Sequence, residues 1–298
     1  GVIAQDVFYS HFTGRIVEDR LSRKASELMQ IFEIDETEVR LLAFLYLIQS
    51  VGGLDDVTCV NSIAELHSLT AAIYGLPLKD VRVALSERSS LTRLGLIEPD
   101  YLPPPHFQVD EMVKRFFRTG SVDVFLANLR PVDGHVYPVD SFSVSTIQRE
   151  TITSLLRSGQ RNQLLLYGTP GTGKTEFAKS IVRDAGLNGF FLTSVDERGG
   201  SERGARILQL QAISKKLDPE GAILIVDEAD HLLNSEGLFS TGTEKGWLTD
   251  FIDSAAISII WISNSIDETH EAVLRRFTYS LQFRPTSGRT REQTWNRL

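Results

Sequence analysis

Short apolar runs alternate with amphipathic segments through the second half of the chain. Each run ends in polar or turn-forming residues, and the runs occupy residues 162–168, 189–195, 221–228, 257–264 and 279–283. Segments with a helical spacing of apolar residues lie between them, at 174–186, 201–217, 245–255 and 269–277. Buried strands that alternate with helices predict a parallel, five-stranded α/β sheet. Ligands of such sheets bind at the carboxyl ends of the strands, so chemistry is expected at the polar residues that end the runs.

The first half of the chain has a helical pattern instead. Residues 36–50 carry a wide apolar face, and residues 62–75 begin with the spacing of a capping box and end in glycine. Residues 78–90 predict a third helix, and residues 91–100 predict a short strand. Helix, helix, turn, helix and strand in this order are typical of a winged helix.

A segment rich in proline and glycine, residues 130–140, separates these two patterns. Such a composition predicts a linker. We therefore expect a mostly helical, winged-helix-like domain over residues 1–135 and an α/β domain over residues 136–285.

The charge of the chain argues against nucleic acid as its main partner. The net charge is -8, and residues 1–135 hold 13 Lys and Arg against 19 Asp and Glu. Contacts to nucleic-acid phosphates need a basic face. DNA binding by the winged-helix-like domain is therefore possible but less favoured than docking to a protein.

Composition also bears on where the protein works. The longest dense apolar run, residues 41–48, is far too short to span a bilayer, so we expect no membrane partner. The chain has one cysteine, which cannot form a disulfide within the chain. Both features fit a cytoplasmic protein.

The segment GTPGTGKT at residues 168–175 fits the phosphate-binding motif G-x-x-x-x-G-K-[ST], and it lies between a predicted strand and a predicted helix. Its glycines let backbone N–H groups face phosphate oxygens. Lys174 is expected to reach the β- and γ-phosphates, and Thr175 to bind Mg²⁺. The candidate nucleotide-binding residues are Gly168, Thr169, Pro170, Gly171, Thr172, Gly173, Lys174 and Thr175.

Two more strands end in residues suited to phosphate chemistry. Asp227 ends one buried run and can hold Mg²⁺ bound to the nucleotide, while Glu228 after it can polarise an attacking water. Asn264 ends the next run, where its amide can orient that water or contact the γ-phosphate. Asp230 suggests only a local capping or surface role.

Residues 139–285 resemble the nucleotide-binding core of the AAA+ ATPases. The resemblance rests on residues 168–175 and 223–228, Asn264 and the LRRF segment at 274–277, in the order and at the spacing of that family. It implies an enzyme that hydrolyses ATP with Mg²⁺. It also implies a homo-oligomeric ring, usually a hexamer, that does mechanical work on a partner.

The resemblance implies roles for further residues. Arg275 or Arg276 would act on the γ-phosphate in the site of a neighbouring copy, and the sequence does not choose between them. Val139 and Phe142 would form walls of the adenine pocket. Residues 286–298 would be the first turns of the helical lid that follows the core, and we expect the chain to be truncated within that lid.

We favour a ring-forming ATPase that remodels a protein partner or complex, with residues 1–135 as an adaptor. Two alternatives stay open. One is a DNA-associated switch that uses the winged-helix-like domain. The other is a nucleotide-gated assembly scaffold, because residues 196–206 lack the aromatic residue that polypeptide-threading rings carry at this place.

Overall fold

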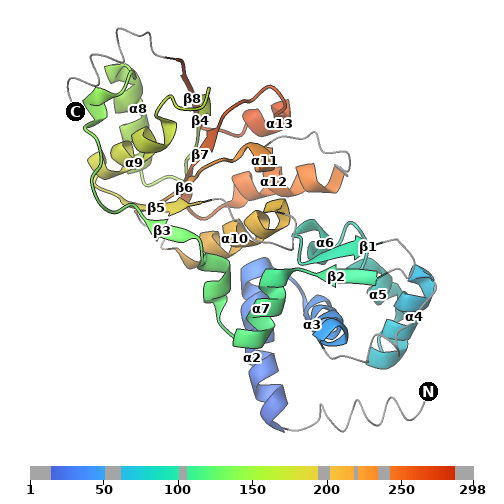
Figure 1. Cartoon of the computed structure of the whole chain (residues 1–298). Coiled ribbons are helices and arrows are strands. Elements are labelled where there is room, and N and C mark those ends of the chain that lie inside the picture. Colours follow the sequence, from blue (N-terminus) through green and yellow to red (C-terminus); the bar gives the residue numbers. More distant parts are fainter. Residues whose placement is uncertain are drawn as a thin grey trace. The chain divides into compact units, whose positions relative to one another are not determined.

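The structure, a computed structural model, describes residues 15–50, 62–100, 106–193, 202–217, 221–233 and 242–285. Contacts within the chain divide it into two compact units. The first unit extends to Phe125 and includes helix α10 (Glu202–Lys216) up to Ala212. The second unit begins at Leu126 and contains the large sheet (Figure 1).

The first unit is mostly helical and carries one small antiparallel sheet, formed by β1 and β2. Its elements are α2 (Arg15–Phe32), α3 (Glu36–Ser50), α4 (Ile63–Tyr74), α5 (Leu78–Ala84), α6 (Ser90–Arg93), β1 (Ile97–Asp100), β2 (His106–Val109), α7 (Glu111–Thr119) and the 3-10 helix η1 (Val122–Leu126). The predicted helices over residues 36–50 and 62–75 are confirmed. Helix α4 begins where the Ser62 hydroxyl accepts from the Glu65 N–H at 3.2 Å, and it ends at left-handed Gly75. Helices α2 and α7 are additional to the predicted elements.

The prediction of one helix over residues 78–90 is wrong. Helix α5 ends at Ala84, and a separate short helix, α6, begins at Ser90. Serine hydroxyls explain the break, because they compete for the backbone groups that a continuous helix would use. The Ser86 hydroxyl donates to Val83 O, and the Ser89 side chain caps α6. The predicted strand over residues 91–100 is likewise confined to β1.

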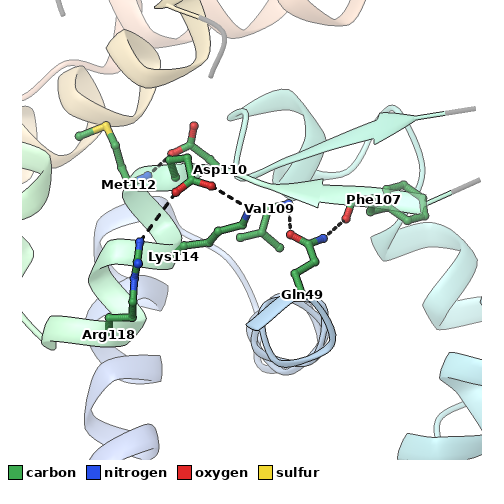
Figure 2. Close-up of polar contacts among 8 residues, drawn as sticks. Gln49, Phe107, Val109, Asp110, Met112, Lys114 and Arg118 are labelled. Atoms are coloured by element: carbon green, nitrogen blue, oxygen red, sulfur yellow. Dashed lines mark hydrogen bonds and ion pairs between the residues drawn. The ribbon is translucent and has the colours of Figure 1, made fainter. Parts of the chain in front are cut away.

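One glutamine ties α3 to the small sheet. The side chain of Gln49 donates to Phe107 O and accepts from Val109 N at 3.2 Å, so it pairs with β2 as a neighbouring strand would (Figure 2). Immediately after β2, the Asp110 side chain accepts from Met112 N at 2.7 Å and caps α7. These contacts satisfy backbone groups that would otherwise need water, since each buried N–H and C=O requires a partner.

The second unit is built on a six-stranded sheet in the order β3-β5-β6-β7-β4-β8. The strands are β3 (Leu129–Pro131), β4 (Gln163–Gly168), β5 (Asn188–Leu192), β6 (Ala222–Val226), β7 (Ser258–Ser263) and β8 (Tyr279–Phe283). The five predicted strands are confirmed, and they pair in parallel. The sixth strand, β3, is an edge strand antiparallel to β5 and is not predicted, because it overlaps the start of the predicted linker.

Helices lie on both sides of this sheet, as Figure 1 shows, with α8 and α9 on one side and α12 on the other. The helices and 3-10 helix of this unit, besides the end of α10, are η2 (Val139–Ser141), α8 (Thr146–Arg157), α9 (Lys174–Asp184), α11 (Asp230–Leu233), α12 (Gly242–Ser254) and α13 (Glu271–Leu274). Strands β6 and β7 are buried along their whole length, as strands covered on both faces are. The Trp261 indole N–H donates to the Gln163 side chain at 2.9 Å, so this buried polar pair is satisfied.

No helix among the described residues is long and apolar enough to cross a membrane. Residues 286–298, which we expect to begin a lid, lie outside the described residues. Most of the segment 196–206 lies outside them as well.

Candidate nucleotide site

The phosphate-binding motif begins at Gly168, the last residue of β4, where the structure has no room for a side chain. Gly168 has φ +137°, and a Cβ atom built on it would lie 2.0 Å from the carbonyl oxygen of Phe283 at the end of β8. Only glycine allows this close approach of two backbones. The parallel pairing of β4 and β8 thus sets where the loop leaves the sheet.

The loop then turns back on itself before α9 begins. Gly171 and Gly173 have φ +75° and +86°, a region that favours glycine. The Thr172 hydroxyl donates to Thr169 O at 2.8 Å, while Thr169 and Pro170 are exposed. The loop thus leads into the N-terminus of α9, where free backbone N–H groups attract anions.

Lys174 is the buried cation of the site, with 5% of its surface exposed. Its Nζ donates to Gly168 O at 2.6 Å, to Thr169 O at 3.1 Å and to Asn264 Oδ1 at 3.1 Å. Burial lowers the pKa of Lys174, and the nearby carboxylates at the end of β6 and the start of α11 oppose this effect. The ammonium group therefore lies beside both the motif and the end of β7.

The end of β6 meets the start of α9. The Thr175 hydroxyl donates to Asp227 Oδ2 at 3.0 Å, and Asp227 Oδ1 accepts from Glu228 N at 2.9 Å. Glu228 is exposed and has φ +50°, a conformation that costs a non-glycine residue about 1–3 kcal/mol and that clusters at functional sites. A hydroxyl and a carboxylate oxygen side by side are the kind of ligands that Mg²⁺ prefers, so these residues fit the predicted metal.

Asn264 follows β7 and connects two parts of the site. Its side-chain oxygen accepts from Lys174, and its side-chain nitrogen donates to Asp230 at 3.3 Å. The sequence pattern indicates only a local role for Asp230. Its contact with Asn264 depends on the pairing of β6 and β7, which places residues that are 34 positions apart next to each other.

The two residues predicted to line the adenine pocket, Phe142 and Val139, lie in different surroundings. The ring of Phe142 would lie 3.6 Å from a Cβ atom at Gly173 and packs edge-on against Phe177, so it lies beneath the phosphate-binding loop. Val139 is half-buried and lines a separate cavity of about 390 Å³ with residues of α8 and α9 such as Arg149. The structure thus places only Phe142 directly against the loop.

The adjacent arginines after α13 have different surroundings. Arg275 pairs with Glu271 one turn earlier, and both side chains are more than 70% exposed. Arg276 is 33% exposed, and it donates to Asp253 Oδ2 at 2.8 Å and to Ala272 O at 2.6 Å. Arg276 is therefore held by its own chain, whereas Arg275 extends into solvent.

Comparisons with known proteins match the region that contains these residues. Residues 164–285 match the family model described as ATPase family associated with various cellular activities (AAA). Spastin of Drosophila persimilis is 27% identical over 147 residues, which cover 45% of this chain and 18% of that spastin. Spastin of Drosophila melanogaster is 26% identical over 147 residues, which cover 45% of this chain and 19% of that spastin. The match thus spans less than a fifth of these relatives.

One chain of known structure is also similar. It comes from the structure titled "Structure of E. coli MS115-1 HORMA:CdnC:Trip13 complex". The match has 16% sequence identity and a TM-score of 0.43, and it covers 58% of this chain and 75% of that one.

Proposed function

We propose that this chain binds ATP and hydrolyses it to ADP and phosphate, because residues 164–285 match the AAA ATPase family model. We further propose that copies of the chain assemble into a ring, as a hexamer, and that the ring remodels a protein partner or complex. The observation that supports the proposal is that residues of the phosphate-binding motif form hydrogen bonds with residues at the ends of β6 and β7. Lys174 bonds to Asn264 after β7, and Thr175 bonds to Asp227 after β6.

The first task of these residues is to bind the triphosphate. Lys174 exchanges its contacts with backbone carbonyls for phosphate oxygens, since an ammonium group donates only. Backbone N–H groups of the loop add donors at the start of α9. Thr175 and Asp227 would hold Mg²⁺, which when bound neutralises charge on the phosphates.

The second task is to attack the γ-phosphate with water. Glu228 follows Asp227 directly and is exposed, so its carboxylate can accept a proton from a water beside the γ-phosphate. Asn264 contacts Lys174, and this contact supports a role for its amide in orienting that water. Glu228 is thus the proposed general base, and Asn264 is the proposed orienting group.

A third contribution comes from a neighbouring copy. An arginine supplied from outside a phosphoryl-transfer site stabilises charge on the γ-phosphate and raises the rate by roughly 10³–10⁵. Arg275 suits this role, because its exposed side chain can leave Glu271 at little cost. Arg276 suits a supporting role, since its bonds to Asp253 and Ala272 fix the end of α13.

ATP turnover by the Glu228→Gln variant tests the proposal. Glutamine keeps the shape of the side chain but is no base, so the variant should bind ATP normally and hydrolyse it at least roughly 100-fold more slowly. Glu98→Gln, at an exposed position of β1 in the first unit, makes the same charge change outside the motif and should match the parent rate. Turnover by Glu228→Gln at the parent rate would refute the proposed mechanism.

A further inference from the structure

The carboxylate of Asp230 accepts several hydrogen bonds from the end of β7 and the residues that follow it. Its Oδ1 accepts from the Ser263 hydroxyl at 2.8 Å, from Asn264 N at 2.8 Å and from Ser265 N at 3.3 Å. Its Oδ2 accepts from the side-chain nitrogen of Asn264 at 3.3 Å. Both carboxylate oxygens therefore act as acceptors, and their donors among the described residues are the last residue of β7 and the two residues after it.

These contacts fix which way the amide of Asn264 faces. On one side lies Lys174, whose ammonium group only donates, so the amide must turn its oxygen there. On the other side lies Asp230 Oδ2, which requires the amide nitrogen. A flipped amide would place NH₂ against the ammonium group and oxygen against the carboxylate, so both contacts would be lost.

We infer that Asp230 is a positioning residue of the ATPase site, which acts by holding the Asn264 amide with its oxygen toward the phosphate-binding lysine. Asp230 stands two positions after Glu228, at the first residue of α11. The carboxylate thus fixes the orienting amide relative to the proposed general base. The inference rests on the proposed function, because Asn264 orients the attacking water there.

The Asp230→Asn variant removes the acceptor of the Asn264 amide nitrogen and one negative charge near Lys174. Its side-chain oxygen can still accept the three bonds of Oδ1, so the turn after β7 should keep its structure. An NH₂ group replaces Oδ2 and faces the NH₂ of Asn264, where two donors cannot pair. The reverse orientation of the new amide is worse, since it would turn NH₂ toward three donors. The Asn264 amide must therefore flip or move away from its place beside Lys174.

We expect Asp230→Asn to lower kcat roughly tenfold, the scale on which outer partners of reactive groups act. Nucleotide affinity should not fall, because the lost charge is negative and lies near Lys174, and Tm should stay at the parent value. A purely structural role would not give this separation. Asp267→Asn is the matched control, because it removes one carboxylate from the same loop. Asp267 is exposed and bonds to Ser265 and not to Asn264, so kcat of this control should be unchanged.

A double-mutant cycle tests whether Asp230 acts through Asn264. Once Asn264→Ala has removed the amide, Asp230→Asn should cost no further activity, and the double variant should match Asn264→Ala alone. If the two losses multiply, or if Asp230→Asn is as active as Asp267→Asn, the inference is wrong. A fall in Tm and in nucleotide affinity parallel to the fall in kcat would also overturn it.

One readout does not depend on hydrolysis. In the nucleotide-free protein, the NMR signals of the Asn264 side-chain NH₂ should shift in Asp230→Asn and stay in place in Asp267→Asn. Unchanged signals in Asp230→Asn would refute the inference by itself. Absence of ATP turnover by the parent protein would instead refute the proposed function, so the two failures can be told apart.

Discussion

Single residues of the candidate site combine burial with charge, and Lys174 is the clearest case. It is almost fully buried, yet its three bonds go to two backbone carbonyls and one amide oxygen. Neutral acceptors give less than an anion would, because an anionic oxygen adds the attraction between opposite charges to the hydrogen bond. The ammonium group is therefore poised to exchange its two backbone carbonyl partners for phosphate oxygens.

Replacement of Lys174 by alanine should abolish tight nucleotide binding. The loss should be at least about tenfold in affinity, since one hydrogen bond to a charged group is worth about 1.5–3 kcal/mol. Titration with a fluorescent ATP analogue measures it. Lys179→Ala is the control, because Lys179 lies on the same helix and pairs with Glu176. Equal affinities for the two variants would contradict the assignment of Lys174.

Glu38 is a second buried charge, and it caps two helices in the first unit. Its carboxylate accepts from Asp35 N at 3.1 Å and from Ser90 N at 3.2 Å, at the starts of α3 and α6. Burial raises the pKa of Glu38, and the bonds to backbone N–H groups oppose this effect. The folded protein thus holds this proton more tightly than the unfolded chain does.

This shift makes a prediction about pH. Where the folded state binds more protons than the unfolded state, the free energy of unfolding falls as pH rises. The stabilisation that protonated Glu38 contributes therefore declines as pH rises above 4.5, the ordinary pKa of glutamate. Glu38→Gln cannot ionise, and the variant should therefore gain stability relative to the parent between pH 4 and pH 7. Denaturant unfolding at both values measures the difference, with Glu36→Gln, exposed on the same helix, as control. A difference that stays constant across this range would contradict the prediction.

Secondary-structure elements are joined by specific side chains as well as by apolar packing. Gln49 supplies α3 with both a donor and an acceptor for β2, and Figure 2 shows the two bonds side by side. The amide of glutamine carries a donor nitrogen and an acceptor oxygen side by side. The orientation of α3 on the small sheet depends on this pairing.

Gln49→Glu should therefore destabilise the first unit. Glutamate can still accept from Val109 N, but its second oxygen would face the Phe107 carbonyl, and an unsatisfied buried group costs about 1–3 kcal/mol. Gln30→Glu, on an exposed position of α2, makes the same charge change without such a contact. Denaturant unfolding should show a loss for Gln49→Glu that is larger than for Gln30→Glu. Equal losses would show that the Gln49 bonds contribute nothing.

Sequence patterns predicted the elements whose formation depends on local signals. The central strands are long apolar runs, and the motif at residues 168–175 needs only its own spacing. Strand β3 could not be found this way, because it is three residues long, ends in Pro131 and exists through pairing with β5. The hydrogen bond from Asn264 to Asp230 could not be predicted for a similar reason. It forms only because β6 and β7 pair, which brings together residues that are far apart in the sequence.

The whole molecule, in the proposed account, is one member of a ring. The chain's own residues bring together a phosphate-binding lysine, a carboxylate pair and an orienting amide, and the proposed arginine belongs to the next copy. Head-to-tail contacts that close into a ring give every site the same neighbour. A defect in Glu228 and a defect in Arg275 would then lie on opposite sides of each boundary between copies.

Mixing two inactive variants tests this central claim most directly. Glu228→Gln and Arg275→Ala should each hydrolyse ATP poorly. In an equal mixture, about a quarter of the boundaries in a random head-to-tail ring pair an intact Glu228 with an intact Arg275. The mixture should regain turnover that neither variant shows alone. Glu228→Gln mixed with Lys174→Ala is the control, since both changes disable the same side of a boundary and no site is restored. If the first mixture stays inactive although light scattering shows that mixed assemblies form, the site is not completed by a neighbour's Arg275.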